Sequence, residues 1–339
     1  MTRTERDPRK PTRRRTIATV GSLALGATLS GCRVRPPESA QRRFSIVVLP
    51  DTQHYSRLDN GLFEQQARWI VDNQDEHDVA AVLHLGDLVD NPAEDSEWDV
   101  ATDAVSMLDD AGIPTLVALG NHDAAEIRAP TAFRRRLPTA RYATAESRTD
   151  SIVGYGTYDG NPENAYLRQR VAGEDLLYLT VEFGPRQAVV EWADRVLSAH
   201  SDALAFLTTH SYLYFDDTRV DRDDDHNPRQ YGLTDVHNGV ELWAELVRNH
   251  ANLVNVHSGH HVPGNTGRRL DDGGAGTAVS QMFVNYQTER RGGNGWLRLL
   301  TVDPDRRRLA VSTYSPALDR WQRGADAEFD VFLATKRGN

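Results

Sequence analysis

The sequence predicts an α/β layered domain. From Phe44 onward, short apolar runs alternate with longer amphipathic stretches, which is the pattern of strands and helices packed in layers. Hydrophobic residues make up 39% of the 339 positions and charged residues 26%, which supplies enough apolar side chains for a core and excludes wholesale disorder. Several of the apolar runs end in polar residues, and these ends are spread over residues 51–261. Because they share one pattern along most of the chain, we expect one domain over residues 44–335 and not two.

The apolar runs and the amphipathic stretches give the expected elements in order. Strands are predicted at Phe44–Pro50, Val79–Leu85, Pro114–Leu119, Leu176–Val181, Ala203–Thr209 and Ala251–Val256. Helices are predicted at about 61–74, 94–110, 185–199 and 235–250, and Pro185 suits the first turn of the third. After residue 275, further strands are expected at Ala278–Tyr286, Trp296–Val302 and Leu309–Tyr314. Little order is expected between Asp216 and Tyr231, where few apolar side chains are available for burial.

The N-terminus has the organisation of an export signal. Residues 1–15 carry seven positive and two negative charges, and the 16 residues of 16–31 carry none. That uncharged run is shorter than the roughly 20 apolar residues of a membrane-spanning helix. The segment ThrArgArgArgThrIle at 12–17 resembles a twin-arginine export signal, and LeuSerGlyCys at 29–32 resembles a prokaryotic lipobox. We expect an export signal at 1–31 and a lipidated tether at 32–43, with Cys32 anchoring an extracytoplasmic protein to the cell membrane; the alternative is a buried cysteine in an ordinary helix.

Charge and cysteine content exclude several classes of partner. The chain has 39 basic and 49 acidic residues, a net charge of -10, and removal of residues 1–31 leaves 32 and 47, a net charge of -15. Nucleic acids and anionic membranes bind to positively charged protein surfaces. We therefore expect no nucleic-acid partner, and membrane contact only through the lipid anchor. Cys32 is the single cysteine, which excludes an internal disulfide and any cysteine-rich zinc or iron–sulfur site.

Five expected strands end at residue types that bind metal ions. The residues that follow these strand ends are Asp51-Thr52-Gln53-His54, Gly86-Asp87-Leu88-Val89-Asp90, Gly120-Asn121-His122-Asp123, His210 and His257-Ser258-Gly259-His260-His261. In open α/β sheets, ligands bind beyond the carboxyl ends of the strands, so these side chains can converge on one pocket. Carboxylate, amide and imidazole donors without thiolate suit Mn, Fe, Zn or Mg. There are too many donors for one tetrahedral zinc, which favours two adjacent ions that clamp a phosphoryl group.

This ordered set of motifs resembles the calcineurin-like metallophosphoesterase superfamily, in a branch whose first motif is Asp-Thr-Gln. The resemblance spans roughly residues 44–315 and implies a four-layer αββα sandwich of two mixed β-sheets. It also implies a metal-dependent hydrolase of phosphomonoesters or phosphodiesters, in which a metal-bound hydroxide attacks phosphorus at a dinuclear site. Two divalent or trivalent ions (Mn, Fe or Zn) are the implied cofactors, and a phosphorylated small molecule is the implied substrate.

The resemblance also implies a role for each motif residue. Asp51 and Gln53 would serve the first metal, and Asp87 would bridge both. The second metal would be completed by Asn121, His210 and His260. His122 would act as the general acid, and its unperturbed pKa of about 6.5 suits proton transfer near neutrality. Asp90 would orient the other ring nitrogen of His122, with a helix cap before Pro92 as the alternative, and His84 is expected to be a core histidine and not a ligand.

Two positions depart from the superfamily pattern. Gln53 stands where the first motif usually has His, and Val262 stands where the last motif has its second His. An amide oxygen is a poorer donor than imidazole, so the first metal should bind less tightly. Whether His261 or His54 replaces the missing imidazole is left open by the sequence, because a one-residue slip on a strand turns a side chain to the opposite face.

The sequence says less about the residues that bind the substrate. Arg290 and Arg291 are candidates for holding phosphate, and Tyr212 and Tyr214 for walling the pocket; solvated charge and rim packing are the alternatives. The rival functions are a metal- or phosphate-binding lipoprotein with little turnover, which the two departures favour, and a nuclease, which the acidic charge disfavours.

Overall fold

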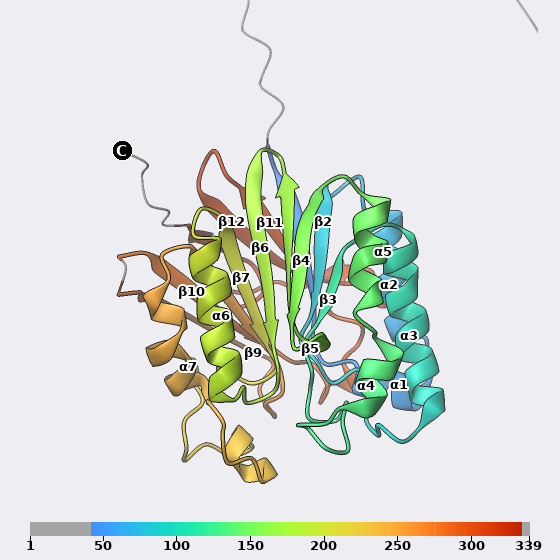
Figure 1. Cartoon of the computed structure of the whole chain (residues 1–339). Coiled ribbons are helices and arrows are strands. Elements are labelled where there is room, and N and C mark those ends of the chain that lie inside the picture. Colours follow the sequence, from blue (N-terminus) through green and yellow to red (C-terminus); the bar gives the residue numbers. More distant parts are fainter. Residues whose placement is uncertain (1–41, 275, 334–339) are drawn as a thin grey trace, which may run out of the picture. The chain divides into compact units, whose positions relative to one another are not determined.

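Two seven-stranded β-sheets pack face to face in the computed structural model, which describes residues 42–274 and 276–333 (Figure 1). The export signal, Cys32 and all but the last two residues of the expected tether lie outside the described residues. Within the described ranges, no helix combines the length and the hydropathy that a membrane crossing requires.

The first sheet has the strand order β13-β12-β11-β1-β2-β3, and β14 also pairs with β12. Strands β1, β2 and β3 are parallel, and β11 joins β1 antiparallel. Every residue of β1 and β2 is buried, as expected for strands covered on both faces. The bounds of the strands are Phe44–Leu49 for β1, Val79–His84 for β2, Thr115–Val117 for β3, Leu297–Asp303 for β11, Arg308–Ser315 for β12, Arg320–Trp321 for β13 and Phe329–Phe332 for β14.

The second sheet has the order β4-β5-β6-β7-β8-β10-β9. Its centre, β6-β7-β8-β10, is parallel, and its two edges are antiparallel. The bounds of its strands are Ile152–Tyr158 for β4, Asn161–Val171 for β5, Glu174–Val181 for β6, Leu204–Thr209 for β7, Leu253–Ser258 for β8, Thr266–Asp272 for β9 and Ala278–Val284 for β10.

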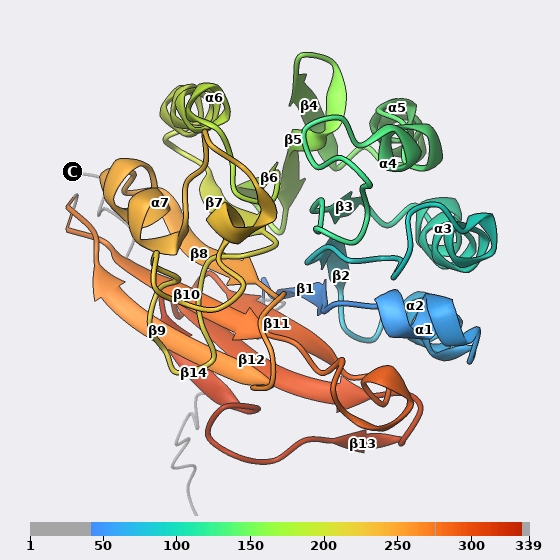
Figure 2. The ribbon, with the colours of Figure 1, turned by 90° about the horizontal axis from the view of Figure 1, so that it is seen from below.

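Helices cover the outer faces of both sheets, so the domain has four layers (Figure 2). One hydrophobic core lies between the sheets, a second between the first sheet and α1 to α3, and a third between the second sheet and α6 and α7. The helices are α1 at Gln53–Leu58, α2 at Leu62–Asp72, α3 at Asp95–Asp110, α4 at Thr131–Arg136, α5 at Ala140–Arg148, α6 at Gln187–Ala199 and α7 at Gly239–Glu245. The expected four-layer αββα sandwich of two mixed sheets is confirmed.

Two expectations about local structure are wrong. The helix expected at 235–250 is only α7 and a short 3₁₀ turn at Val247–Asn249, because Asn238 and Glu241 form a capping box that starts the helix at Gly239. The segment from Asp216 to Tyr231 is ordered without a core of its own. Its Asp and Asn side chains bind backbone groups, as in the cap that Asn227 provides for the 3₁₀ helix Pro228–Tyr231.

Candidate metal centre

Four of the predicted ligands come together at the ends of β2, β3, β7 and β8. His210 Nε2 lies 3.1 Å from Asp87 Oδ2 and 3.1 Å from Asn121 Oδ1. One ligand atom each from Asp87, His210 and His260 lies within 4.8 Å of the others, and all three residues are buried. Two imidazoles, a carboxylate and an amide oxygen form a donor set that fits a divalent transition-metal ion.

Main-chain carbonyls fix which ring nitrogen of each histidine faces this group. Nδ1 of His210 lies 2.8 Å from the Leu85 carbonyl oxygen, and Nε2 of His260 lies 2.9 Å from the His226 carbonyl oxygen. A carbonyl oxygen only accepts hydrogen bonds, so these nitrogens carry the protons, which leaves Nε2 of His210 and Nδ1 of His260 to bind an ion. Neither carbonyl was anticipated from the sequence.

The electrostatics of the group favour a positive charge at its centre. Burial lowers the pKa of His210, but the Asp87 and Asp51 carboxylates outweigh burial and raise this pKa to about 9. The charge preference is reciprocal, because His210 and His122 hold the pKa of Asp87 below its usual range although burial opposes this. The carboxylates that stabilise an imidazolium would equally stabilise a bound cation.

The glycines of the motifs are required by the close approach of these carboxylates. A Cβ atom at Gly120 would lie 2.0 Å from Asp87 Oδ1, and one at Gly259 would lie 2.1 Å from Asp51 Oδ1. Gly86 has a φ of +102°, a conformation that residues with a Cβ rarely adopt. Gly120 and Gly259 therefore let a carboxylate approach closely, whereas Gly86 allows the backbone turn and the approach of His210, whose Nδ1 would lie 2.8 Å from an added Cβ.

Asp123 is a residue of the site that sequence reasoning missed. Its buried carboxylate accepts backbone hydrogen bonds from Asp87 at 2.9 Å, Leu88 at 2.7 Å and Gly120 at 2.9 Å. Burial, together with the Asp87 charge, raises the pKa of Asp123 to about 7. The carboxylate thereby ties together the two loops that carry Asp87 and Asn121. The signal available in the sequence was its place as the last residue of Gly-Asn-His-Asp.

Asp51 and Gln53 lie beside this group but contact amides. Asp51 Oδ2 accepts hydrogen bonds from the backbone N–H of His260 at 3.0 Å and from Asn285 Nδ2 at 3.0 Å. Burial raises the pKa of Asp51 to about 7. Gln53 Nε2 donates to Asp87 Oδ2 at 3.3 Å and to Gln287 Oε1, whereas Gln53 Oε1 is buried with no hydrogen-bond partner. Asn285 and Gln287 had no assigned role in the sequence.

The two histidines left open by the sequence are engaged elsewhere. Nδ1 of His54 lies 3.1 Å from the Gln287 carbonyl oxygen, and its Nε2 lies 3.8 Å from Asp90 Oδ1. Nε2 of His261 lies 3.0 Å from Ser211 Oγ. Neither belongs to the group around Asp87.

His122 lies at the opening of the site. Its backbone N–H donates to Asp87 Oδ1 at 2.9 Å, and its side chain is 41% exposed. Nδ1 lies 2.9 Å from the main-chain carbonyl oxygen of Asp90, whereas the Asp90 carboxylate lies 3.8 Å away and pairs with Arg57 at 3.0 Å. Burial lowers the pKa of His122, but the Asp87 carboxylate and the Asp90 carbonyl raise it above its usual value. Asp90 is not a helix cap, because α3 begins at Asp95.

The remaining candidates are placed away from the donor atoms. His84 is confirmed as a core histidine, since it is buried between Thr52 Oγ1 at 3.0 Å and the Gly86 N–H at 3.1 Å. Tyr212 is fully buried, and its hydroxyl donates to Gln281, so it does not wall a pocket. Arg290 and Arg291 are exposed in a 3₁₀ turn, and the Arg291 guanidinium reaches the carbonyl of Asn60. Tyr214 is half-buried, and its ring lies 4.7 Å from the His261 ring between centroids, with the two planes tilted by 59°.

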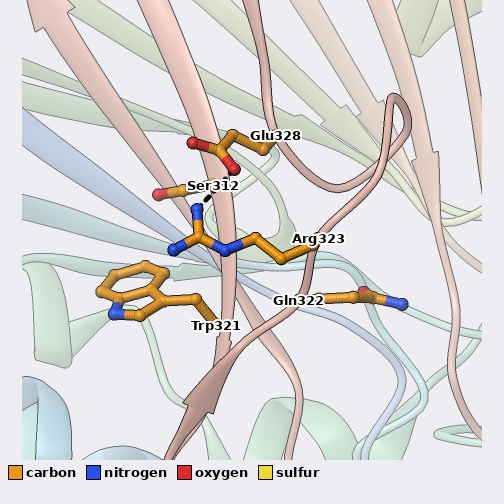
Figure 3. Close-up of a pocket in the computed structure, with 5 residues that line it drawn as sticks. All are labelled: Ser312, Trp321, Gln322, Arg323 and Glu328. Carbon is orange, nitrogen blue, oxygen red and sulfur yellow. Dashed lines mark hydrogen bonds and ion pairs between the residues drawn. The ribbon is translucent and has the colours of Figure 1, made fainter.

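A cavity of about 450 Å³ opens beside Asn121 and is walled by Ile127, Arg128, Tyr231 and Leu233. The Arg128 guanidinium donates to Glu182 at 2.7 Å and to two main-chain carbonyls, so it braces the wall. A second hollow on β12 and β13 contains Trp321 and the ion pair between Arg323 and Glu328 (Figure 3). That hollow includes none of the predicted site residues, whereas Asn121 lines the cavity of about 450 Å³.

The four-layer sandwich gathers histidine, carboxylate and amide donors at its strand ends, which defines a candidate metal-binding protein. Residues 44–286 match the calcineurin-like phosphoesterase family, and the chain belongs to that family. It is 32% identical over 286 residues to YvnB of Bacillus subtilis strain 168; the match covers 83% of this chain and 20% of that protein, so the chain spans about a fifth of its relative. Among solved structures, the purple acid phosphatase PPD1 of yellow lupin (Lupinus luteus) shares the fold, with a TM-score of 0.50, 11% identity and coverage of 85% of this chain and 53% of that one.

Proposed function

We propose that this protein hydrolyses phosphate ester bonds of a small phosphorylated molecule, with metal held by Asp87, Asn121, His210 and His260. The observation that carries the proposal is the convergence of three buried donors, Asp87, His210 and His260, with the half-buried Asn121, where main-chain carbonyls fix the tautomers of the two histidines. A divalent ion held there would neutralise charge on the phosphoryl group and activate water for attack. Manganese, iron and zinc all suit these donors.

His122 is proposed as the general acid. Its Nδ1 is fixed on the Asp90 carbonyl, which leaves Nε2 on the opposite side of the ring, and its half-exposed side chain lies at the opening of the site. A protonated Nε2 would donate to the leaving oxygen, and a raised pKa keeps that proton in place near neutral pH. Asp90 is a positioning residue that acts through its backbone.

The test is hydrolysis of p-nitrophenyl phosphate and of bis(p-nitrophenyl) phosphate by the purified chain after loading with Mn, Fe or Zn. We expect turnover that falls by about 100-fold or more in His122→Ala and is abolished in Asp87→Ala. Gln187→Ala, an exposed change on α6, is the matched control. If the wild type is no faster than the double variant His122→Ala, Asp87→Ala, the protein is instead a metal- or phosphate-binding lipoprotein with little turnover.

We also propose that the chain is exported and held on the outer face of the cell membrane by a lipid on Cys32. The basic and then uncharged N-terminus and the lipobox-like sequence at 29–32 support this proposal. In a bacterial host, the wild-type protein should sediment with membranes, and Cys32→Ser should be released to the soluble extracytoplasmic fraction. An unchanged distribution of Cys32→Ser would contradict the proposal. We also expect that single-stranded DNA does not compete with the p-nitrophenyl esters in the hydrolysis assay, because a chain with a net charge of -10 repels a polyanion.

A further inference from the structure

We infer that the centre holds one metal ion, and that side-chain amides occupy the position of the first ion of a dinuclear site. This inference rests on the proposed function, because it concerns the same site. It departs from the two ions that the motif order implies.

The carboxylate and imidazole donors are distributed unevenly between the two positions. Within residues 42–274 and 276–333, the metal-binding group consists of Asp87, His210 and His260, with Asn121 beside it, and Asp51 is not a member. The two positions that would supply imidazole to a first ion carry Gln53 and Val262. His261, next to Val262, is bound to Ser211. The first position therefore has one carboxylate of its own and no imidazole.

Amide groups take up the lone pairs that a first ion would need. Asn285 Nδ2 donates to Asp51 Oδ2, and the Asn285 side-chain oxygen is itself held by the Gln287 backbone N–H at 3.0 Å. Gln53 Nε2 donates to Asp87 Oδ2, the oxygen that lies 3.1 Å from His210 Nε2, and also to Gln287. These N–H donors occupy lone pairs of the two carboxylates that a first ion would otherwise bind.

The oxygens that remain are a poor set for a second ion. Asp87 Oδ1 is taken by the His122 backbone N–H, and Asp51 is also held by the His260 backbone N–H. Gln53 Oε1, a neutral amide oxygen, is buried there without a hydrogen-bond partner. A carboxylate already bound by two N–H groups and one amide oxygen are weaker donors than the carboxylate, amide and two imidazoles of the group at Asp87. Asp51 is then a positioning residue, which holds the backbone next to His260.

The experiment counts ions in the full chain. Protein stripped with a chelator is titrated with Mn²⁺, the bound metal is measured by elemental analysis, and electron paramagnetic resonance distinguishes isolated from coupled ions. The variants are Asp51→Asn, which keeps an acceptor for the His260 N–H, and Asp87→Asn, with Gln187→Ala as the surface control. Thermal melting checks that each variant is folded.

We expect one Mn²⁺ per chain with the signal of an isolated ion in the wild type, the same count in folded Asp51→Asn, and none in Asp87→Asn. Two ions, an exchange-coupled signal, or no ion in the wild type would overturn the inference, and so would loss of the ion in folded Asp51→Asn. The wild-type count decides the matter even if Asp51→Asn does not fold. Two ions with turnover would leave the proposed function standing, whereas one ion without turnover would overturn that function and leave the ion count standing.

Discussion

The Gly120→Ala change tests whether the strand-end loops hold Asp87 in a metal-binding position. The added Cβ would lie 2.0 Å from Asp87 Oδ1 and 2.2 Å from the Asp87 backbone nitrogen, whereas ordinary contact begins at 3.4 Å. Asp87 would therefore have to retreat by roughly 1.4 Å, well beyond the tolerance of about 0.2 Å on metal–ligand distances. Because the Asp87 nitrogen is also bound to Asp123, the loop cannot move without breaking that bond.

The expected result follows from this displacement. Mn²⁺ affinity should fall by at least about 10- to 100-fold, hydrolysis by about 100-fold or more, and the free energy of unfolding by about 1–3 kcal/mol. Isothermal titration, the bis(p-nitrophenyl) phosphate assay and thermal melting measure these three effects. Gly274→Ala is the matched control, since its Cβ would lie 3.5 Å from its nearest neighbour, the Arg248 carbonyl oxygen. A folded Gly120→Ala protein with unchanged Mn²⁺ affinity and turnover would refute the reasoning.

Three other substitutions probe the acid, the loop brace and the buried carboxylate at the end of β11. Asp90→Asn should reduce kcat by less than about 10-fold, far less than His122→Ala, because the imidazole is held by the Asp90 carbonyl; equal losses in the assay would show that the carboxylate does the orienting. Asp123→Asn turns an N–H group toward backbone N–H donors, so denaturant unfolding should show a loss of about 1–3 kcal/mol; unchanged stability would exclude Asp123 as the brace between the loops. Burial opposes ionisation of Asp303, but hydrogen bonds from Arg306 lower its pKa from 3.8 to about 2, so its contribution is present above pH 3.8 and is lost as the pH falls through about 2. Asp303→Asn should therefore be less stable than the wild type at pH 7 by about 1–2 kcal/mol, with the difference vanishing near pH 2; a difference that does not depend on pH would contradict the linkage.

All nine strands that the apolar runs predicted are confirmed, as β1, β2, β3, β6, β7, β8, β10, β11 and β12. Strands buried on both faces are long apolar runs, so their position is visible in the sequence. Strand β5, which lies between β4 and β6, was missed because its sequence includes the polar residues Glu163 and Asn164, although both are buried. Their burial is compensated by Arg134 at 3.1 Å and Glu182 at 3.1 Å, residues that lie far away in the chain and that local pattern cannot connect.

The order of the motifs determined which residues supply the donors, because strand-end positions follow from where apolar runs stop. Only the tertiary structure decided how those donors are divided between the two possible ion positions. It turned Nε2 of His210 and Nδ1 of His260 toward Asp87, and it brought Asn285 and Gln287 from the end of β10 onto Asp51 and Gln53. Ring orientation and amide contacts depend on main-chain carbonyls and strands that meet only after folding. The sequence therefore determined which donor types are available to the site, and packing decided that the histidine donors gather around Asp87.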